Sequence, residues 1–82
     1  MEEITVEKTF TLKELAHYNG QDGAPAYIAV DGVVYDVSQR SAWKNGQHHG
    51  YKAGNDFSEQ IKRAPHEKSV LPRLPKVGKL IN

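Results

Sequence analysis

The 82-residue sequence contains no cysteine. Disulfides, thiolate zinc sites, iron–sulfur clusters, cysteine nucleophiles and thioether-linked cofactors are therefore excluded. The chain also lacks a long apolar run, since the longest, residues 26–30, has five residues and a spanning helix needs about 20. The N-terminus is acidic where a signal peptide would be basic and then apolar. We therefore expect a soluble, cytoplasmic protein with no membrane segment.

Charge is nearly balanced overall but unevenly distributed. Residues 1–39 carry two Lys and seven acids (−5), residues 40–68 carry six bases and three acids (+3), and the remaining tail adds +3, which gives +1 in total. The bases are dispersed, without the clustered run or interleaved aromatics of a nucleic-acid surface, so we expect no nucleic-acid partner.

The length fits a single domain over residues 1–82 with a thin core. Domains of this size bury only roughly 60% of the surface that their unfolded chain exposes. They commonly depend on a disulfide, a metal or a large ligand for stability. Without cysteine, a metal or a bulky bound molecule remains.

A β-hairpin over residues 26–37 is the clearest structural element. Two apolar runs flank Asp31-Gly32, a pair typical of a two-residue hairpin turn. Both runs are apolar at odd and even positions, which is the pattern of strands buried on both faces. The hairpin is therefore expected to separate two small cores, or one core and a ligand pocket.

Shorter elements surround this hairpin. Thr11 and Glu14 form a capping-box pattern that opens a brief helix, which ends at Asn19-Gly20. Residues 38–55 show no sustained period, and a long loop of this kind is usually functional or disordered. The other expected elements are a strand at residues 5–10, a capped helix at 56–64, a short helix near 70–74 and a strand at 77–80.

Two of the four histidines flank the predicted 56–64 helix. His49 lies in a glycine-flanked loop before it, and His66 follows the proline that ends it. Two imidazoles on opposite sides of an apolar cleft suit haem, which needs two axial ligands and an apolar slot. A bare zinc site would want a fourth ligand and polar surroundings. His17, at the end of the first helix, is expected only to complement the helix dipole.

Residues 53–59, Ala-Gly-Asn-Asp-Phe-Ser-Glu, followed by Pro65-His66, resemble a motif of the cytochrome b5-like haem/steroid-binding family. The step of thirteen residues from Ala53 to His66 is the one that this family uses before its second haem-ligating histidine. The opening helix, the central hairpin and the closing strand also resemble the family, over about residues 10–80. This resemblance implies an α+β fold, a central mixed sheet with short helices forming a haem pocket.

The first ligand departs from the best-known cytochromes b5, because their His-Pro-Gly-Gly motif is absent. The short step of four residues from His49 to Ala53 is similar to the branch of membrane-associated progesterone-receptor components, where a Tyr takes the position of His49. Adjacent residues in extended chain point to opposite sides, so His48 and His49 should not both reach one iron. We favour His49, with His48 as its substitute and Tyr51 as a third candidate.

The resulting hypothesis is a b-type cytochrome that carries electrons and is not itself a catalyst, since no hydrolytic triad, phosphate loop or carboxylate pair is visible. His49 and His66 would be the axial ligands of a non-covalent haem b. The apolar wall is expected to comprise Phe57, Ile61, Val70, Leu71 and Leu74, with Tyr27 or Val30 from the hairpin.

The net +3 of residues 40–68 predicts a redox partner with an acidic docking face, bound by a monomer. Two alternatives remain open. One is a binding or sensor module for haem or a steroid-like ligand, without redox turnover. The other is a structural zinc or copper site built on histidines.

Overall fold

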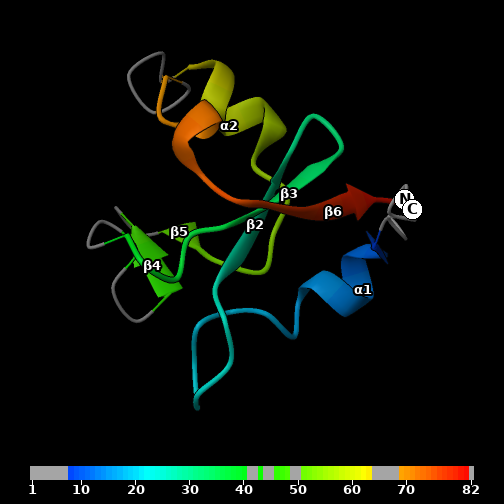
Figure 1. Cartoon of the computed structure of the whole chain (residues 1–82), viewed down its shortest axis with the longest axis vertical. Helices are drawn as coiled ribbons and strands as arrows, with labels where there is room; N and C mark the ends of the chain where they lie inside the picture. Colours follow the sequence, from blue (N-terminus) through cyan, green and yellow to red (C-terminus); the bar gives the residue numbers. More distant parts are fainter. Residues whose placement is uncertain (1–7, 41–42, 44–45, 49–50, 64–68, 82) are drawn as a thin grey trace, which may run out of the picture.

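The computed structural model describes residues 8–40, 43, 46–48, 51–63 and 69–81 (Figure 1). Its elements, in chain order, are β1 (Thr9–Phe10), α1 (Leu12–Leu15), β2 (Tyr27–Val30), β3 (Val33–Asp36), β4 (Gln47–His48), β5 (Tyr51–Lys52), α2 (Ser58–Lys62), the 3-10 helix η2 (Leu71–Arg73) and β6 (Lys76–Leu80). In this part of the chain, no helix has the length and apolar character needed to cross a membrane.

A four-stranded sheet in the order β1-β6-β3-β2 forms the centre of the molecule. β1 and β6 run parallel, whereas β6, β3 and β2 pair antiparallel, so the predicted mixed sheet is confirmed. β4 and β5 form a separate two-stranded ribbon, in which His48 pairs with Tyr51. Sequence analysis expected only loop there, because strands of two residues leave no periodic pattern.

The β2–β3 hairpin has the predicted two-residue turn. Val30 pairs with Val33, and Asp31 and Gly32 both have positive φ, +50° and +80°. This is the combination that a type I′ turn requires and that Asp-Gly supplies at low cost. The turn therefore fixes which hairpin residues face each side of the sheet.

Two apolar clusters lie on opposite faces of this sheet, as the double-sided apolar pattern predicted. The first, here called the pocket cluster, consists of Ala26, Ile28, Val30, Tyr35, Val37, Ala53, Phe57, Leu71 and Leu74, with Val33, Trp43, Ile61 and Val70 packed against it. The second, the rear cluster, consists of Phe10, Leu15, Ala29 and Val34, with Tyr18, Tyr27, Val77 and Leu80 packed against it. Alternate residues of β2 divide between the two clusters, as the period of two in a strand dictates.

The two α-helices differ in how they begin. The capping box of α1 is present, because the Thr11 hydroxyl accepts the Glu14 N–H and the Glu14 carboxylate accepts the Thr11 N–H. α2 spans Ser58–Lys62, shorter than the expected 56–64, and its N-cap is Phe57 with no side-chain capping bond. The later start follows from the backbone of residues 54–57, which is still paired with β2.

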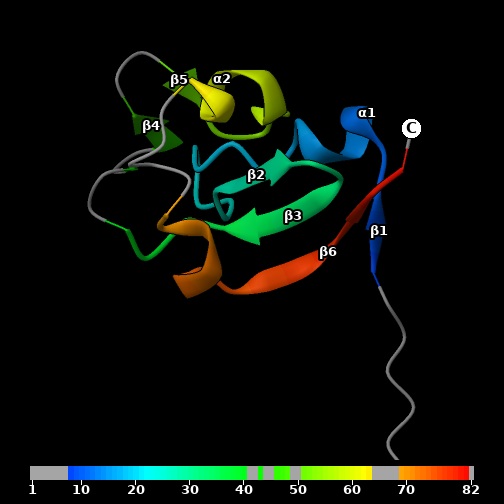
Figure 2. The ribbon, with the colours of Figure 1, turned by 90° about the horizontal axis from the view of Figure 1, so that it is seen from above.

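The sheet separates two ends of the molecule. The β4–β5 ribbon and η2 lie toward one end, and β1 lies at the other, in both Figure 1 and Figure 2. β1 pairs with the end of β6, with Phe10 opposite Leu80. The first and last described residues therefore meet at the end away from the ribbon.

Candidate functional site

The two favoured ligands, His49 and His66, lie outside the described residues. For His48, the structure describes the backbone, which pairs with Tyr51 in the β4–β5 ribbon. The identity of the first ligand therefore stays a prediction, with His48 and Tyr51 as its alternatives.

The residues that bracket these histidines in the sequence all belong to one apolar cluster. His49 lies between Trp43 and Ala53, and both of these contact the pocket cluster. His66 lies between Ile61 and Val70, which also pack against it. The described residues that flank each predicted ligand in the sequence therefore lie on the same face of the sheet.

Five of the predicted wall residues meet in the pocket cluster. Phe57, Leu71 and Leu74 are buried, whereas Ile61 and Val70 are partly buried at its margin. This graded burial fits an apolar wall that is not fully covered by protein. Haem requires such a wall, with nitrogen bases on either side of the ring.

Of the two hairpin residues expected at this wall, only Val30 lies in the pocket cluster. Tyr27 lies in the rear cluster, on the other face of β2. The placement of Tyr27 corrects the expectation that it lines the pocket. The two positions differ by three residues, an odd number, so they cannot share a face of a regular strand.

The Phe57 ring contacts two aromatic rings that sequence analysis had not placed beside it. The centroids of the Trp43 and Phe57 rings are 5.8 Å apart. The Tyr51 ring meets the Phe57 ring edge-on, with 5.4 Å between their centroids. Tyr51 is 45% exposed, so this aromatic group extends from the cluster to the surface. The spacing of apolar residues in the sequence could not predict these contacts, because Trp43 and Tyr51 belong to residues 38–55, which show no regular hydrophobic period.

Phe57 is held at the wall by backbone pairing with the outer edge of β2. The Gly54 N–H donates to the Tyr27 carbonyl at 2.7 Å, and the Ala29 N–H donates to the Asn55 carbonyl at 3.0 Å. The Phe57 N–H then donates to the Ala29 carbonyl, also at 2.7 Å. Gly54 adopts a φ of +91°, which few other residues could adopt at low cost. The Ala-Gly step of the sequence motif therefore serves to align Phe57 with the sheet.

Tyr27 packs among the aromatic side chains of the rear cluster rather than at the pocket. Its ring stacks on Tyr18 at 4.6 Å and meets Phe10 edge-on at 5.8 Å. Burial raises the pKa of the Tyr27 hydroxyl, and the negative charges of Asp36 and of ionised Tyr18 raise it further. Desolvation and nearby like charge both disfavour the phenolate.

Other features of the described residues do not form a competing site. They contain no group of three His, Asp or Glu side chains placed to hold a metal ion. An open hollow of about 390 Å³ lies beside Trp43, with Asp36, Ser38 and Gly46 in its lining. Its glycine-rich, polar lining differs from the apolar wall that a haem face needs.

Comparison with known proteins agrees with this architecture. The family model for the cytochrome b5-like haem/steroid-binding domain matches residues 11–81. A solved cytochrome b5 domain protein from Hadesarchaea is 49% identical, with a TM-score of 0.85 over 90% of this chain and 99% of that one.

Two further solved structures are similar. The cytochrome b5 domain protein of Methanococcoides burtonii is 42% identical, with a TM-score of 0.86 over 93% of this chain and all of that one. An Arabidopsis thaliana protein described as having a cytochrome b5-like fold is 21% identical, with a TM-score of 0.74 over the full length of both, and supports the fold alone. With a family match over most of its length and two archaeal relatives above 40% identity, this chain belongs to the cytochrome b5-like haem/steroid-binding domain family.

Proposed function

We propose that the chain binds one non-covalent haem b through His49 and His66 and acts as an electron carrier rather than a catalyst. The observation that supports this most directly is the bracketing of both histidines by residues of the pocket cluster. Two nitrogen bases would then approach from two segments that share one apolar wall. The archaeal relatives are cytochrome b5 domain proteins, which is in keeping with this proposal.

Bound haem would supply an iron centre that exchanges one electron. The two histidines must be neutral to bind it, and together they would occupy both axial positions, which favours outer-sphere electron transfer over oxygen activation. Phe57, Leu71 and Leu74 would exclude water from the face of the ring and so help to set its potential.

The charge around the wall favours a partner with an acidic docking face. Among the described residues within two positions of the pocket cluster or of a residue packed against it, five bases and three acids are exposed: Lys52, Lys62, Arg63, Arg73 and Lys76 against Asp31, Asp56 and Glu59. Such a contact should weaken as ionic strength rises, because salt screens exposed charges. Measured electron transfer to an acidic partner should therefore slow with added salt, and rates independent of salt would contradict this docking mode.

Titration with hemin tests the haem proposal. Wild-type protein should develop a Soret band and, on reduction, sharp α and β bands that carbon monoxide does not change. His66→Ala and His49→Ala should each lose this spectrum, whereas His17→Ala, a change at an exposed residue beyond α1, should keep it. Loss in His48→Ala instead of His49→Ala would reassign the first ligand.

Other outcomes distinguish the alternatives. A protein that stays colourless with hemin would refute the proposal and favour a module for another ligand, such as a steroid. Binding of carbon monoxide by the reduced wild type would show an open coordination site and would contradict ligation by two histidines.

A further inference from the structure

The start of β2 is held by an Asp-x-Ser tripeptide, residues 36–38. The Ser38 N–H donates to Asp36 Oδ1 at 2.8 Å, which closes a tight turn. The Ser38 Oγ then accepts the N–H of Ala26, the residue before β2, also at 2.8 Å. We call this arrangement the Ser38 clamp.

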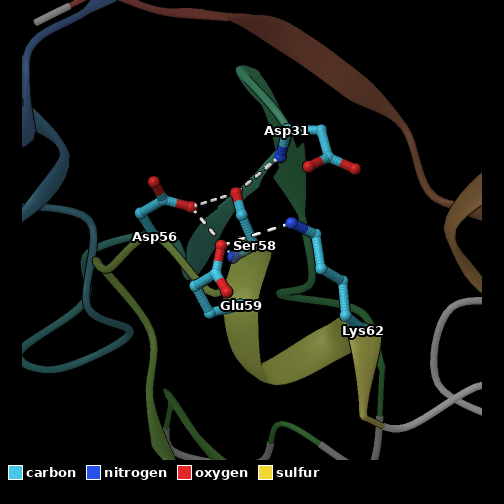
Figure 3. A network of polar contacts seen from close by, with 5 residues as sticks. All are labelled: Asp31, Asp56, Ser58, Glu59 and Lys62. Carbon is cyan, nitrogen blue, oxygen red and sulfur yellow. Dashed lines mark hydrogen bonds and ion pairs between the residues drawn. The ribbon is translucent and has the colours of Figure 1, made fainter.

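The end of β2 is held by a second tripeptide of the same kind, residues 56–58. The Ser58 N–H donates to Asp56 Oδ1 at 3.0 Å, and the Ser58 hydroxyl donates to the same oxygen. The Ser58 Oγ accepts the N–H of Asp31, the residue after β2, at 2.7 Å, as Figure 3 shows. This is the Ser58 clamp, and the two clamps thus bond to the backbone on either side of the same strand.

The middle residue of each tripeptide belongs to the pocket cluster. Val37 is fully buried, and Phe57 is buried in the same cluster. Each clamp also stands where the chain leaves the sheet and continues toward a predicted ligand. The Ser38 clamp precedes the segment that contains His49, and the Ser58 clamp opens α2, which leads to His66.

The Ser58 clamp ties the start of α2 to the end of β2, which the short helix could not do through its own backbone. α2 has five residues and no side-chain bond at its N-cap, and helices this short depend on tertiary contacts. The ion pair between Glu59 and Lys62 on this helix is exposed and contributes little. Backbone pairing with β2 ends at Phe57, and the Ser58 hydroxyl provides the next acceptor for the strand as the chain turns into the helix.

We propose that these two clamps are positioning devices for the haem ligands. Ser38 and Ser58 fix the backbone at opposite ends of β2, at the points from which the chain continues toward His49 and toward His66. This inference rests on the haem binding proposed above, and it predicts that loss of either hydroxyl loosens the grip on haem. Both serines act through the backbone and are not ligands themselves.

The test compares Ser38→Ala and Ser58→Ala with Thr11→Ala. All three changes remove a hydroxyl that accepts a backbone N–H, but Thr11 caps α1, which packs through Leu15 on the rear cluster. Each holoprotein is mixed with excess apomyoglobin, and haem transfer is followed by absorption at a temperature where circular dichroism shows every variant folded. The clamp variants should release haem about three- to tenfold faster than wild type, and Thr11→Ala at the wild-type rate.

Two conservative variants and a spectroscopic signature separate positioning from general stability. Ser58→Thr keeps the hydroxyl and should restore slow release, whereas Ser58→Cys, with a weaker acceptor, should be intermediate. The low-spin electron paramagnetic resonance signal, which reports the orientation of axial imidazoles, should shift in the clamp variants and stay unchanged in Thr11→Ala.

The outcomes distinguish this inference from the function beneath it. Normal haem uptake by the wild type, with clamp variants that release haem no faster than Thr11→Ala, would overturn the inference alone. Absence of haem uptake by the wild type would overturn the proposed function and the inference with it.

Discussion

Replacing Gly46 by alanine should destabilise the fold far more than the same change at Gly23. Both residues have positive φ, +74° and +84°, so both substitutions incur the left-handed penalty of about 1–2 kcal/mol. A Cβ at Gly23 would meet nothing within 4 Å. A Cβ at Gly46 would overlap the carbonyl oxygen of Asn19 and lie 2.9 Å from its carbonyl carbon.

The overlap at Gly46 involves backbone atoms, which cannot rotate away as a side chain can. Forced overpacking of this kind costs about 1–3 kcal/mol. The Gly46 carbonyl also accepts the Ala53 N–H at 2.7 Å, so a shift at Gly46 would disturb the base of the β4–β5 ribbon. The expected loss is therefore about 1–2 kcal/mol for Gly23→Ala and about 2–5 kcal/mol for Gly46→Ala.

Thermal and urea unfolding of the two variants, followed by circular dichroism, measure this difference. An 82-residue domain has a total stability of about 4–12 kcal/mol, so the Gly46 variant should lose a large share of it. Its melting temperature should lie at least about 5 °C below that of Gly23→Ala. Equal melting temperatures would show that positive φ accounts for the whole effect and that the close approach to Asn19 does not matter.

Three further predictions concern the rear cluster and the proposed ligands. Leu15→Ala truncates a fully buried side chain and should lower the free energy of unfolding in urea by about 2–5 kcal/mol. Leu12→Ala, at a residue 46% exposed on the same helix, should lower it by less than about 0.5 kcal/mol. Similar losses for the two variants would contradict the assigned rear cluster. The fold raises the pKa of Tyr27, so the stabilising contribution of this side chain is complete below the unfolded pKa of 10.0 and is lost as the pH rises from there through the folded pKa. Tyr27→Phe should therefore flatten the fall in stability at alkaline pH, and an unchanged pH profile would refute this. Acid should release haem, because protons compete for His49 and His66, and a Soret band that persists through about pH 4 would count against two imidazole ligands.

Much of the scaffold could be predicted from local chemistry. The Asp31-Gly32 pair specifies its turn without help from the rest of the chain, and Thr11 with Glu14 specifies the start of α1. The terminal strand was expected at residues 77–80 and is found as β6, Lys76–Leu80. In these places, neighbouring residues alone determine the geometry.

Elements that depend on distant partners were predicted less well. The helix was expected to begin at residue 56, but pairing of residues 54–57 with β2 delays its start to Ser58. The Asp56 carboxylate still accepts the N–H of Ser58, the first residue of α2. The β4–β5 ribbon was missed, because strands of two residues exist through pairing rather than pattern. His49 and His66 remain predictions, which the variants described above can test.

The parallel pairing of β1 with β6 has a practical consequence. Phe10 in β1 pairs with Leu80 at the end of β6. β1 lies at the end of the molecule away from the β4–β5 ribbon, as Figure 2 shows. Linkers joined near these two residues would leave the domain from the same edge. The domain could therefore be inserted into a surface loop of a host protein without separating the two ends of that loop. A protein tethered to an electrode through this end would keep the β4–β5 ribbon turned toward solution.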